Sequence, residues 1–286
     1  MPQINWYPGH MARSRRLLQD QLRAVDAVIE LCDARAPLAT RNPDLERLTR
    51  DKARILILNK ADLADDNDTA RWLEHFRRHG LTAMRFNSNG GKVRDILGHI
   101  DQATKPARDR YAARGVKKSV RTMVIGIPNV GKSTFINRLY GGSIVKAADR
   151  PGVTRSNQWV KLGPYLEILD TPGMLPPRLD NQDSAKLLAY LGSIRDQIMD
   201  TEELASGLLS LLYAINPAAT SARFKLPADV DPDPSELMEA ACRGRGWLLS
   251  GARYDLDRAS ALILDEFRAG KVGKITLQRA ESASNR

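Results

Sequence analysis

Short apolar runs recur along the N-terminal part of the chain, and each of them stops at a polar or glycine-rich cluster. Stretches with helical spacing, such as residues 69–79 and 133–140, lie between the runs. Strands that alternate with helices predict a doubly wound, mostly parallel α/β sheet. Such sheets bind ligands at the carboxyl ends of their strands, so the polar clusters mark the expected site. The apolar runs occupy residues 28–32, 55–58, 84–86, 123–125 and 166–169.

The C-terminal part has a different pattern, which predicts a bundle of helices. An apolar helix follows the capping sequence at residues 200–203, and a second helix has Pro234 at its first position. Residues 256–267 have the spacing of a third helix. We therefore expect an α/β domain at residues 1–180 and a smaller all-α domain at residues 181–286.

The chain is basic, which favours polyanionic partners. Its 286 residues include 44 Lys and Arg against 34 Asp and Glu, and the net charge is +10. Nucleic acid, acidic lipid and phosphorylated ligands all fit such a charge. The first residues lack the features of a signal peptide, and no apolar run is long enough to span a bilayer. The sequence therefore predicts a cytoplasmic protein that binds no membrane, and a monomer is the expected state.

The charge is distributed unevenly along the chain. Residues 180–240 carry a net charge of −7, residues 241–286 carry +4, and residues 1–179 carry +13. The densest basic run lies at residues 105–121. This run is either a solvated linker or a strip that contacts phosphates, and the basic residues after position 241 present the same choice between solvated charge and an RNA-binding face.

The most specific motif is GIPNVGKS at residues 126–133, which fits G-x-x-x-x-G-K-[ST]. Its glycines let backbone N–H groups turn towards a phosphate chain, and the helix that follows adds the positive end of its dipole. We expect Lys132 to reach the β- and γ-phosphates and the Ser133 hydroxyl to bind Mg²⁺. The other residues expected beside the phosphates are Asn129, Val130, Gly131 and Thr134.

The sequence NKAD at residues 59–62 predicts which base is bound. The Asp62 carboxylate can accept hydrogen bonds from the ring N–H and the exocyclic amino group of guanine. Adenine has no such donor pair, and its binding would leave the carboxylate unpaired. We expect Asn59 to brace the loop and the Lys60 stem to cover the ring face. Guanine is therefore favoured over adenine.

The sequence DTPG at residues 170–173 supplies a second carboxylate. Asp170 is expected in the Mg²⁺ shell, and the backbone amide of Gly173 is expected at the γ-phosphate. Thr154 lies between this motif and the phosphate loop, and we expect it to cap Mg²⁺ when a γ-phosphate is present. An ordinary loop threonine is the alternative. Because the chain continues from this motif into the C-terminal segment, ordering of the motif could move that segment.

These motifs stand in an order that ordinary GTPases do not have. There the phosphate loop comes first and N-K-x-D comes late, whereas here residues 59–62 precede residues 126–133, and residues 170–173 follow. The chain opens with WYPGHM at residues 6–11 and has DAR at residues 33–35. In these motifs and their order it resembles the circularly permuted YlqF/RbgA ribosome-biogenesis GTPases.

The resemblance implies a circularly permuted P-loop GTPase domain in an assembly factor. Such a factor hydrolyses GTP and binds the large ribosomal subunit and its rRNA, with the nucleotide state controlling docking and release. The resemblance also implies that the helical domain at residues 181–286 binds RNA. The resemblance also implies that Ser88 contributes to the base site, although Asn89 replaces the alanine of the family pattern. Two alternatives from other classes stay open: a nucleotide-regulated RNA-binding module, and a GTPase switch that acts on a protein partner.

The group that promotes hydrolysis is harder to place. Many GTPases have a glutamine directly after D-x-x-G to orient the attacking water, but this chain has Met174 there. Slow intrinsic hydrolysis that the ribosomal subunit stimulates is the expectation. The resemblance suggests His10 as the catalytic group, whereas packing on Trp6 or contact with RNA phosphate is the alternative. Asn129 is similar to an asparagine of potassium-stimulated relatives, which implies K⁺, and a structural role in the turn is the alternative.

Overall fold

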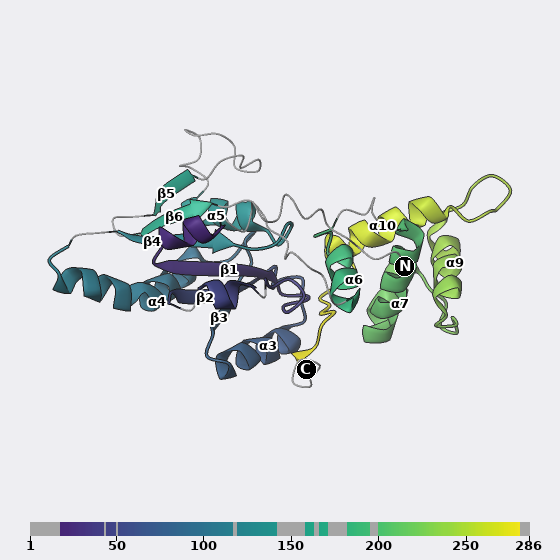
Figure 1. Cartoon of the computed structure of the whole chain (residues 1–286). Helices are drawn as coiled ribbons and strands as arrows, with labels where there is room; N and C mark the ends of the chain where they lie inside the picture. Colours follow the sequence, from purple (N-terminus) through teal and green to yellow (C-terminus); the bar gives the residue numbers. More distant parts are fainter. Residues whose placement is uncertain are drawn as a thin grey trace.

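The computed structural model contains a twisted sheet whose strand order is β3-β2-β1-β4-β6-β5 (Figure 1). β5 pairs antiparallel with β6, and the other neighbouring strands are parallel. The predicted α/β class is confirmed, and β5 is a strand that the apolar runs did not predict. The strands are β1 (Ala27–Asp33), β2 (Ala53–Asn59), β3 (Thr82–Arg85), β4 (Val120–Ile125), β5 (Gln158–Leu162) and β6 (Leu166–Asp170). The structure describes residues 18–42, 44–49, 51–116, 119–141, 158–162, 166–170, 182–194 and 200–280.

The strand order reverses between β1 and β4. From β1 the chain proceeds to β2 and β3 towards one edge of the sheet, whereas β4 and β6 lie on the other side of β1. β1 is therefore paired with β2 on one side and with β4 on the other. A crevice forms outside the carboxyl ends of the strands at such a reversal, and doubly wound proteins bind ligands there.

Helices cover both faces of the sheet. α4 (Val93–Ala113) and α5 (Lys132–Tyr140) pack on one face. The opposite face is covered by α2 (Asp44–Leu48), α3 (Asp66–Arg78) and the helical residues 18–23. Because both faces are buried, the strands are almost continuously apolar instead of alternating with polar residues.

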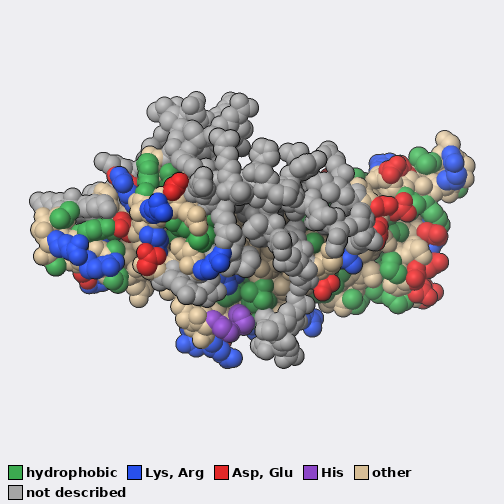
Figure 2. All heavy atoms as spheres, in the orientation of Figure 1, with side chains coloured by type: hydrophobic (Ala, Val, Ile, Leu, Met, Phe, Trp, Pro, Cys, Tyr) green, Lys and Arg blue, Asp and Glu red, His purple; other side chains and the backbone are tan. Residues whose placement is uncertain are grey.

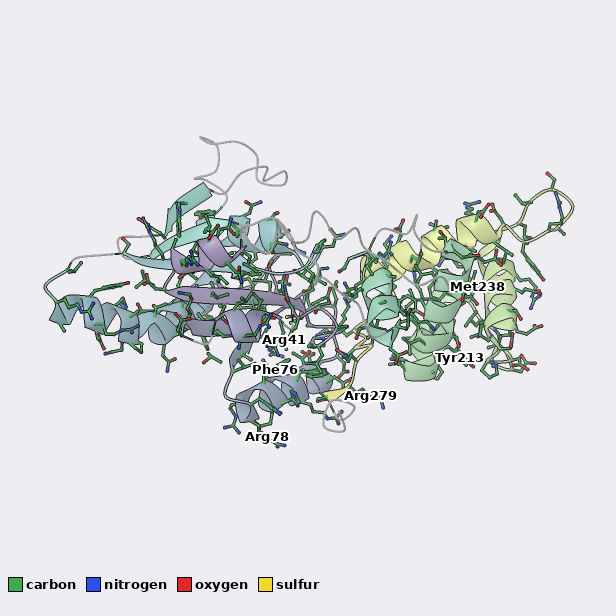
Figure 3. All side chains as sticks on the ribbon, viewed as in Figure 1. Arg41, Phe76, Arg78, Tyr213, Met238 and Arg279 are labelled. Carbon is green, nitrogen blue, oxygen red and sulfur yellow. The ribbon has the colours of Figure 1, made fainter. Side chains whose placement is uncertain are left out.

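Charged side chains also link the sheet to α3 on the face that this helix covers. The buried Glu30 carboxylate binds Arg41 at 3.3 Å and Arg54 at 3.5 Å. The Arg41 guanidinium lies 5.5 Å from the centre of the Phe76 ring, and Figure 3 shows the two side chains next to each other. Phe76 in turn stacks on Trp72 of the same helix. These contacts join the loop after β1 to α3.

The charged run at residues 105–121 is not a linker over most of its length, because α4 continues through Ala113. Ion pairs follow the helix, with 2.6 Å between Lys105 and Asp109 and 2.8 Å between Arg108 and Asp101. Figure 2 shows Lys and Arg side chains gathered over α4. Among the helices that the structure describes, α4 included, none has both the length and the apolar character needed to cross a bilayer.

The C-terminal part is helical, as predicted. α7 is its centre and packs against the four other helices that the structure describes after residue 181. The shared core includes Leu208, Leu237, Ile263 and Phe267, all of which are buried. These helices are α6 (Gln182–Tyr190), α7 (Thr201–Ile215), α8 (Pro217–Phe224), α9 (Pro234–Arg245) and α10 (Leu256–Arg268).

Removing the N-cap of α7 should destabilise this bundle. Oδ1 of Asp200 accepts hydrogen bonds from the backbone N–H groups of Glu202 (2.9 Å) and Glu203 (3.1 Å). Asp200→Ala should lower the free energy of unfolding by about 1 kcal/mol, because it leaves both donors without that acceptor. Asp200→Asn is the matched control and should lose less, since an amide oxygen can still accept. Urea unfolding followed by circular dichroism measures both, and an unchanged alanine variant would contradict the role of this cap.

Candidate nucleotide-binding site

The loop between β4 and α5 lies so close to the ends of β1 and β2 that there is no room for a side chain at the positions of its glycines. At Gly131 the backbone φ is +94°, and a Cβ atom would lie 2.5 Å from Nδ2 of Asn59. At Gly126 a Cβ atom would lie 2.8 Å from the carbonyl oxygen of Leu31. Gly131 also occupies the N-cap of α5 and offers no side chain to the first N–H groups of that helix. These groups can therefore bind an anion placed over the loop.

Lys132 places a buried ammonium group inside the same loop. Its Nζ donates hydrogen bonds to the carbonyl oxygens of Gly126 and Ile127, both at 3.0 Å. Ser133 and Thr134 follow in the first turn of α5, where Ser133 is half-buried and Thr134 is exposed. The loop thus collects one positive charge, several N–H donors and two hydroxyls at the carboxyl end of β4.

The NKAD sequence is hydrogen-bonded directly to this loop. Nδ2 of Asn59 donates to the carbonyl oxygen of Val130 at 2.8 Å, and Nζ of Lys60 donates to that of Asn129 at 2.6 Å. Lys60 has a φ of +57°, a conformation that costs a non-glycine residue about 1–3 kcal/mol. The Asp62 carboxylate forms no hydrogen bond or ion pair with the rest of the described chain, so its oxygens are available to a ligand. The structure brings the two predicted motifs together in one place.

Ser88 joins the site through Asn59. Oδ1 of Asn59 accepts hydrogen bonds from the Ser88 hydroxyl at 2.7 Å and from its backbone N–H at 3.2 Å. At Asn89, where the resemblance departs from the family pattern, the backbone N–H donates to Oδ1 of Asn87 at 2.8 Å. Arg138 of α5 holds the end of this turn by donating to the carbonyl oxygen of Gly91. The turn at residues 87–91 is therefore tied to both the NKAD strand end and α5.

The side chain of Asn129 has a structural contact. Its Nδ2 donates to the carbonyl oxygen of Gly192, just after α6, at 2.5 Å. Arg268 of α10 donates to two more carbonyl oxygens near the end of α6, those of Tyr190 at 3.1 Å and Ala189 at 2.7 Å. The contact of Asn129 agrees with the structural role considered for it, and the amide oxygen remains to be used by a ligand or an ion.

Two buried charges at the end of β1 are functional candidates that motif reasoning did not assign. Asp33 and Arg35 are each 1% exposed, and the guanidinium binds both carboxylate oxygens at 2.9 and 2.8 Å. Nζ of Lys60 lies 3.0 Å from Oδ2 of Asp33. Burial would raise the pKa of Asp33, but the charges of Arg35 and Lys60 and their hydrogen bonds hold that pKa well below its usual value. The available signal was a pair of opposite charges, two residues apart, at the end of a strand that is otherwise apolar except for Glu30.

The remaining predicted site residues are described only in part. His10, Thr154 and Gly173 lie outside the described residues. Asp170 is the last residue of β6, and its backbone is in register with Val124 near the end of β4. Asp170 is therefore placed at the end of the sheet where the phosphate loop begins.

Comparison with known proteins agrees with this geometry. The family model described as a 50S ribosome-binding GTPase matches residues 121–214. Ribosome biogenesis GTPase A of Bacillus cereus is 40% identical over 97% of this chain and 94% of its own length. A GDP-bound structure of YlqF superimposes with a TM-score of 0.71 at 28% identity, covering 93% of this chain and all of that one. GNP-bound YlqF from T. maritima gives a TM-score of 0.66 at 27% identity, with 93% and 98% covered. The chain belongs to the YlqF/RbgA family of circularly permuted GTPases, and it is a GTP-hydrolysing enzyme.

Proposed function

We propose that the chain is an assembly factor of the large ribosomal subunit, acting as a cytoplasmic monomer whose GTP state controls docking and release. The observation that carries the GTP part of this proposal is the direct hydrogen bonding between the NKAD sequence and the phosphate loop, whose partners are 71 and 69 residues apart in sequence. The ribosomal part is supported by the names of the relatives, which include ribosome biogenesis GTPase A and a bovine mitochondrial ribosome-associated GTPase.

In the proposed complex, the guanine edge is bound by Asp62 and the triphosphate lies over the first turn of α5. Backbone N–H groups and Lys132 then neutralise the phosphates, while the Lys60 stem covers the base. Asn59 and Ser88 hold the base loop in shape through their mutual hydrogen bonds. The remaining nucleotide contacts are Asn129, Val130, Gly131, Ser133, Thr134 and Gly173.

The residues present fit a magnesium ion beside the phosphates. Mg²⁺ prefers hard oxygen donors and shares them with phosphate oxygens. Ser133 follows β4 and Asp170 ends β6, and these strands are parallel neighbours, so both residues stand at one end of the sheet. We assign Ser133, Asp170 and Thr154 to the ion, which would neutralise charge that develops on the phosphates. Oδ1 of Asn129 is the proposed ligand of a stimulating K⁺ ion.

Hydrolysis is proposed to be slow in the isolated protein and faster on the ribosomal subunit. Met174 cannot orient a water molecule by hydrogen bonding, so another group must do so. We assign this role to His10, because an imidazole can accept a proton from water near neutral pH. Docking on the subunit would then bring the N-terminal residues to the phosphates.

The basic surface proposed to contact rRNA lies mainly on α4. Arg110 and Arg114 at its C-terminal end are exposed and form no ion pair within the described part of the chain. In contrast, Arg245 of the helical part is tied to Glu266 at 3.0 Å, and acidic side chains are prominent over that part in Figure 2. The proposed division at residues 180 and 181 is supported by the core of the helical part, which consists of residues after position 181 except for Ala36 and Ala39 from the loop after β1.

GTP turnover measured with and without purified large subunits tests the proposal. The subunits should raise turnover of GTP but not of ATP, and K⁺ should raise it more than Na⁺. Reversing the free charges with Arg110→Glu and Arg114→Glu should weaken the stimulation by about tenfold, because phosphate contacts dominate affinity for RNA. The control reverses two exposed charges of α3 with Arg77→Glu and Arg78→Glu. Turnover that stays the same with subunits would contradict the proposed partner.

A further inference from the structure

Arg35 connects the end of β1 to the C-terminal end of α10. Besides its bidentate bond to Asp33, its Nη1 donates to the carbonyl oxygens of Phe267 at 3.2 Å and Arg268 at 3.4 Å. The guanidinium also lies 5.0 Å from the centre of the Phe267 ring. The last carbonyl groups of a helix carry a partial negative charge and lack partners within the helix. Arg35 therefore satisfies the end of α10 and the Asp33 carboxylate with one buried cation.

The chain that follows α10 forms hydrogen bonds with the backbone of the loop after β1. The carbonyl oxygen of Arg35 accepts hydrogen bonds from the N–H groups of Leu277 (2.8 Å) and Gln278 (3.3 Å). Oε1 of Gln278 accepts from the N–H groups of Leu38 (2.8 Å) and Ala39 (3.1 Å). Residues 277 and 278 are thus seated on the loop after β1, more than 230 residues away in sequence.

The segment at residues 270–278 also contacts the loop that contains the NKAD sequence and the residues after it. The N–H group of Ile275 donates to the carbonyl oxygen of Leu63 at 3.1 Å, and the N–H group of Asp65 donates to the Thr276 hydroxyl at 3.1 Å. At Gly270, a Cβ atom would lie 2.5 Å from the Leu63 side chain. Residues 63–65 directly follow Asp62, so the seating of residues 270–278 fixes the backbone beside the guanine-binding carboxylate.

The Asp33 carboxylate is shared between this junction and the nucleotide site. Oδ2 of Asp33 lies 2.8 Å from Nη2 of Arg35 and 3.0 Å from Nζ of Lys60. The same Nζ donates to the carbonyl oxygen of Asn129 in the phosphate loop at 2.6 Å. A buried carboxylate keeps one orientation only while its partners hold it, so loss of Arg35 would let Asp33 turn and draw Lys60 away from the phosphate loop.

We propose that Arg35 is a positioning residue that couples the seating of α10 and residues 275–278 to the affinity for guanine nucleotide. The inference rests on the proposed nucleotide site and adds a means of regulation to it. A contact that lifts the C-terminal segment weakens nucleotide binding, and bound nucleotide strengthens the seating of that segment by the same factor. Because the affected groups surround the base, the change in affinity is similar for GDP and GTP.

Nucleotide affinity and hydrogen exchange of the full-length chain test this coupling. Gln278→Ala and Arg35→Lys should each weaken GDP binding by about tenfold, within the usual range of coupling between sites. In the unchanged protein, GDP should slow amide exchange at residues 264–278, and Gln278→Ala should reduce that protection. Lys274→Ala is the matched control, because it removes only an exposed ion pair of the same segment with Asp66. It should bind GDP as the unchanged protein does.

The outcomes separate this inference from the proposed function. Should Arg35→Lys fail to fold, Gln278→Ala still tests the coupling, because Gln278 is only partly buried and lies outside the nucleotide site. GDP binding within twofold of normal in Gln278→Ala, or GDP-independent exchange at residues 264–278, would overturn the coupling while leaving the site intact. Absence of GDP binding in the unchanged protein would overturn the nucleotide site itself.

Discussion

Asp62→Asn should exchange guanine for xanthine as the preferred base. The carboxylate can accept two hydrogen bonds from guanine, whereas an asparagine amide offers one acceptor and one donor. Xanthine carries a carbonyl group in place of the amino group, and it therefore presents the donor and acceptor pair that the amide needs. Loss of charged hydrogen bonds at about 1.5–3 kcal/mol each predicts a fall of about 100-fold or more in GTP affinity. Calorimetric titration of both proteins with GTP, ATP and xanthosine triphosphate measures the exchange.

Asp51→Asn provides the control, because it neutralises an exposed acid just before β2, away from the carboxyl ends of the strands. This variant should keep the preference of the unchanged protein. Equal affinity of the unchanged protein for ATP and GTP would refute the base assignment. So would an Asp62→Asn variant that still prefers GTP.

The sequence was sufficient for the buried strands because burial on both faces leaves a continuous apolar run. β5 was not predicted from the sequence, because it lacks such a continuous apolar run. It is an edge strand with the sequence QWVKL, in which Gln158 and Lys161 interrupt the apolar residues and Trp159 is 40% exposed. A strand of this kind needs a partner to be recognised, and its partner β6 pairs with it antiparallel.

The full length of α4 was difficult to predict from the sequence because of its charged residues. Arginines and lysines dominate residues 105–114, and Pro106 normally argues against a helix interior. The helix persists because Ile96, Ile100, Thr104 and Ala107 recur at helical spacing and are buried against the sheet. The charged residues occupy the opposite side of the helix. Their pattern therefore indicates which partners this surface binds more than it indicates the conformation of the backbone.

Some parts of the candidate site can be predicted from neighbouring residues, whereas other parts depend on residues far away in the sequence. The phosphate loop and the NKAD sequence are short motifs whose chemistry can be read from neighbouring residues. The role of Arg35 cannot be read locally, because its partners include Phe267 and Arg268, 232 and 233 residues away. A buried charge is tolerated only with partners, and those partners become known only when the chain is folded.

Lys132→Met should abolish tight binding of triphosphate while leaving the fold in place. Methionine fills a similar volume, but it removes the one ammonium group that the phosphate loop encloses. Charge-assisted contacts to two phosphates, at about 1.5–3 kcal/mol each, predict a loss of GTP affinity of about 100-fold or more. Guanosine, which has no phosphate, should compete for the base site equally well in both proteins.

Fluorescent GTP titration with guanosine competition separates the two contributions. Lys105→Met is the control, since it removes an exposed lysine of α4 that pairs only with Asp109 in the same helix. It should leave GTP binding unchanged. If Lys132→Met binds GTP within threefold of normal, the ammonium group does not contact the phosphates, and its bonds to Gly126 and Ile127 serve only to shape the loop. A selective loss of GTP, with guanosine binding retained, would instead show that this lysine acts on the phosphates and leaves base recognition to Asp62.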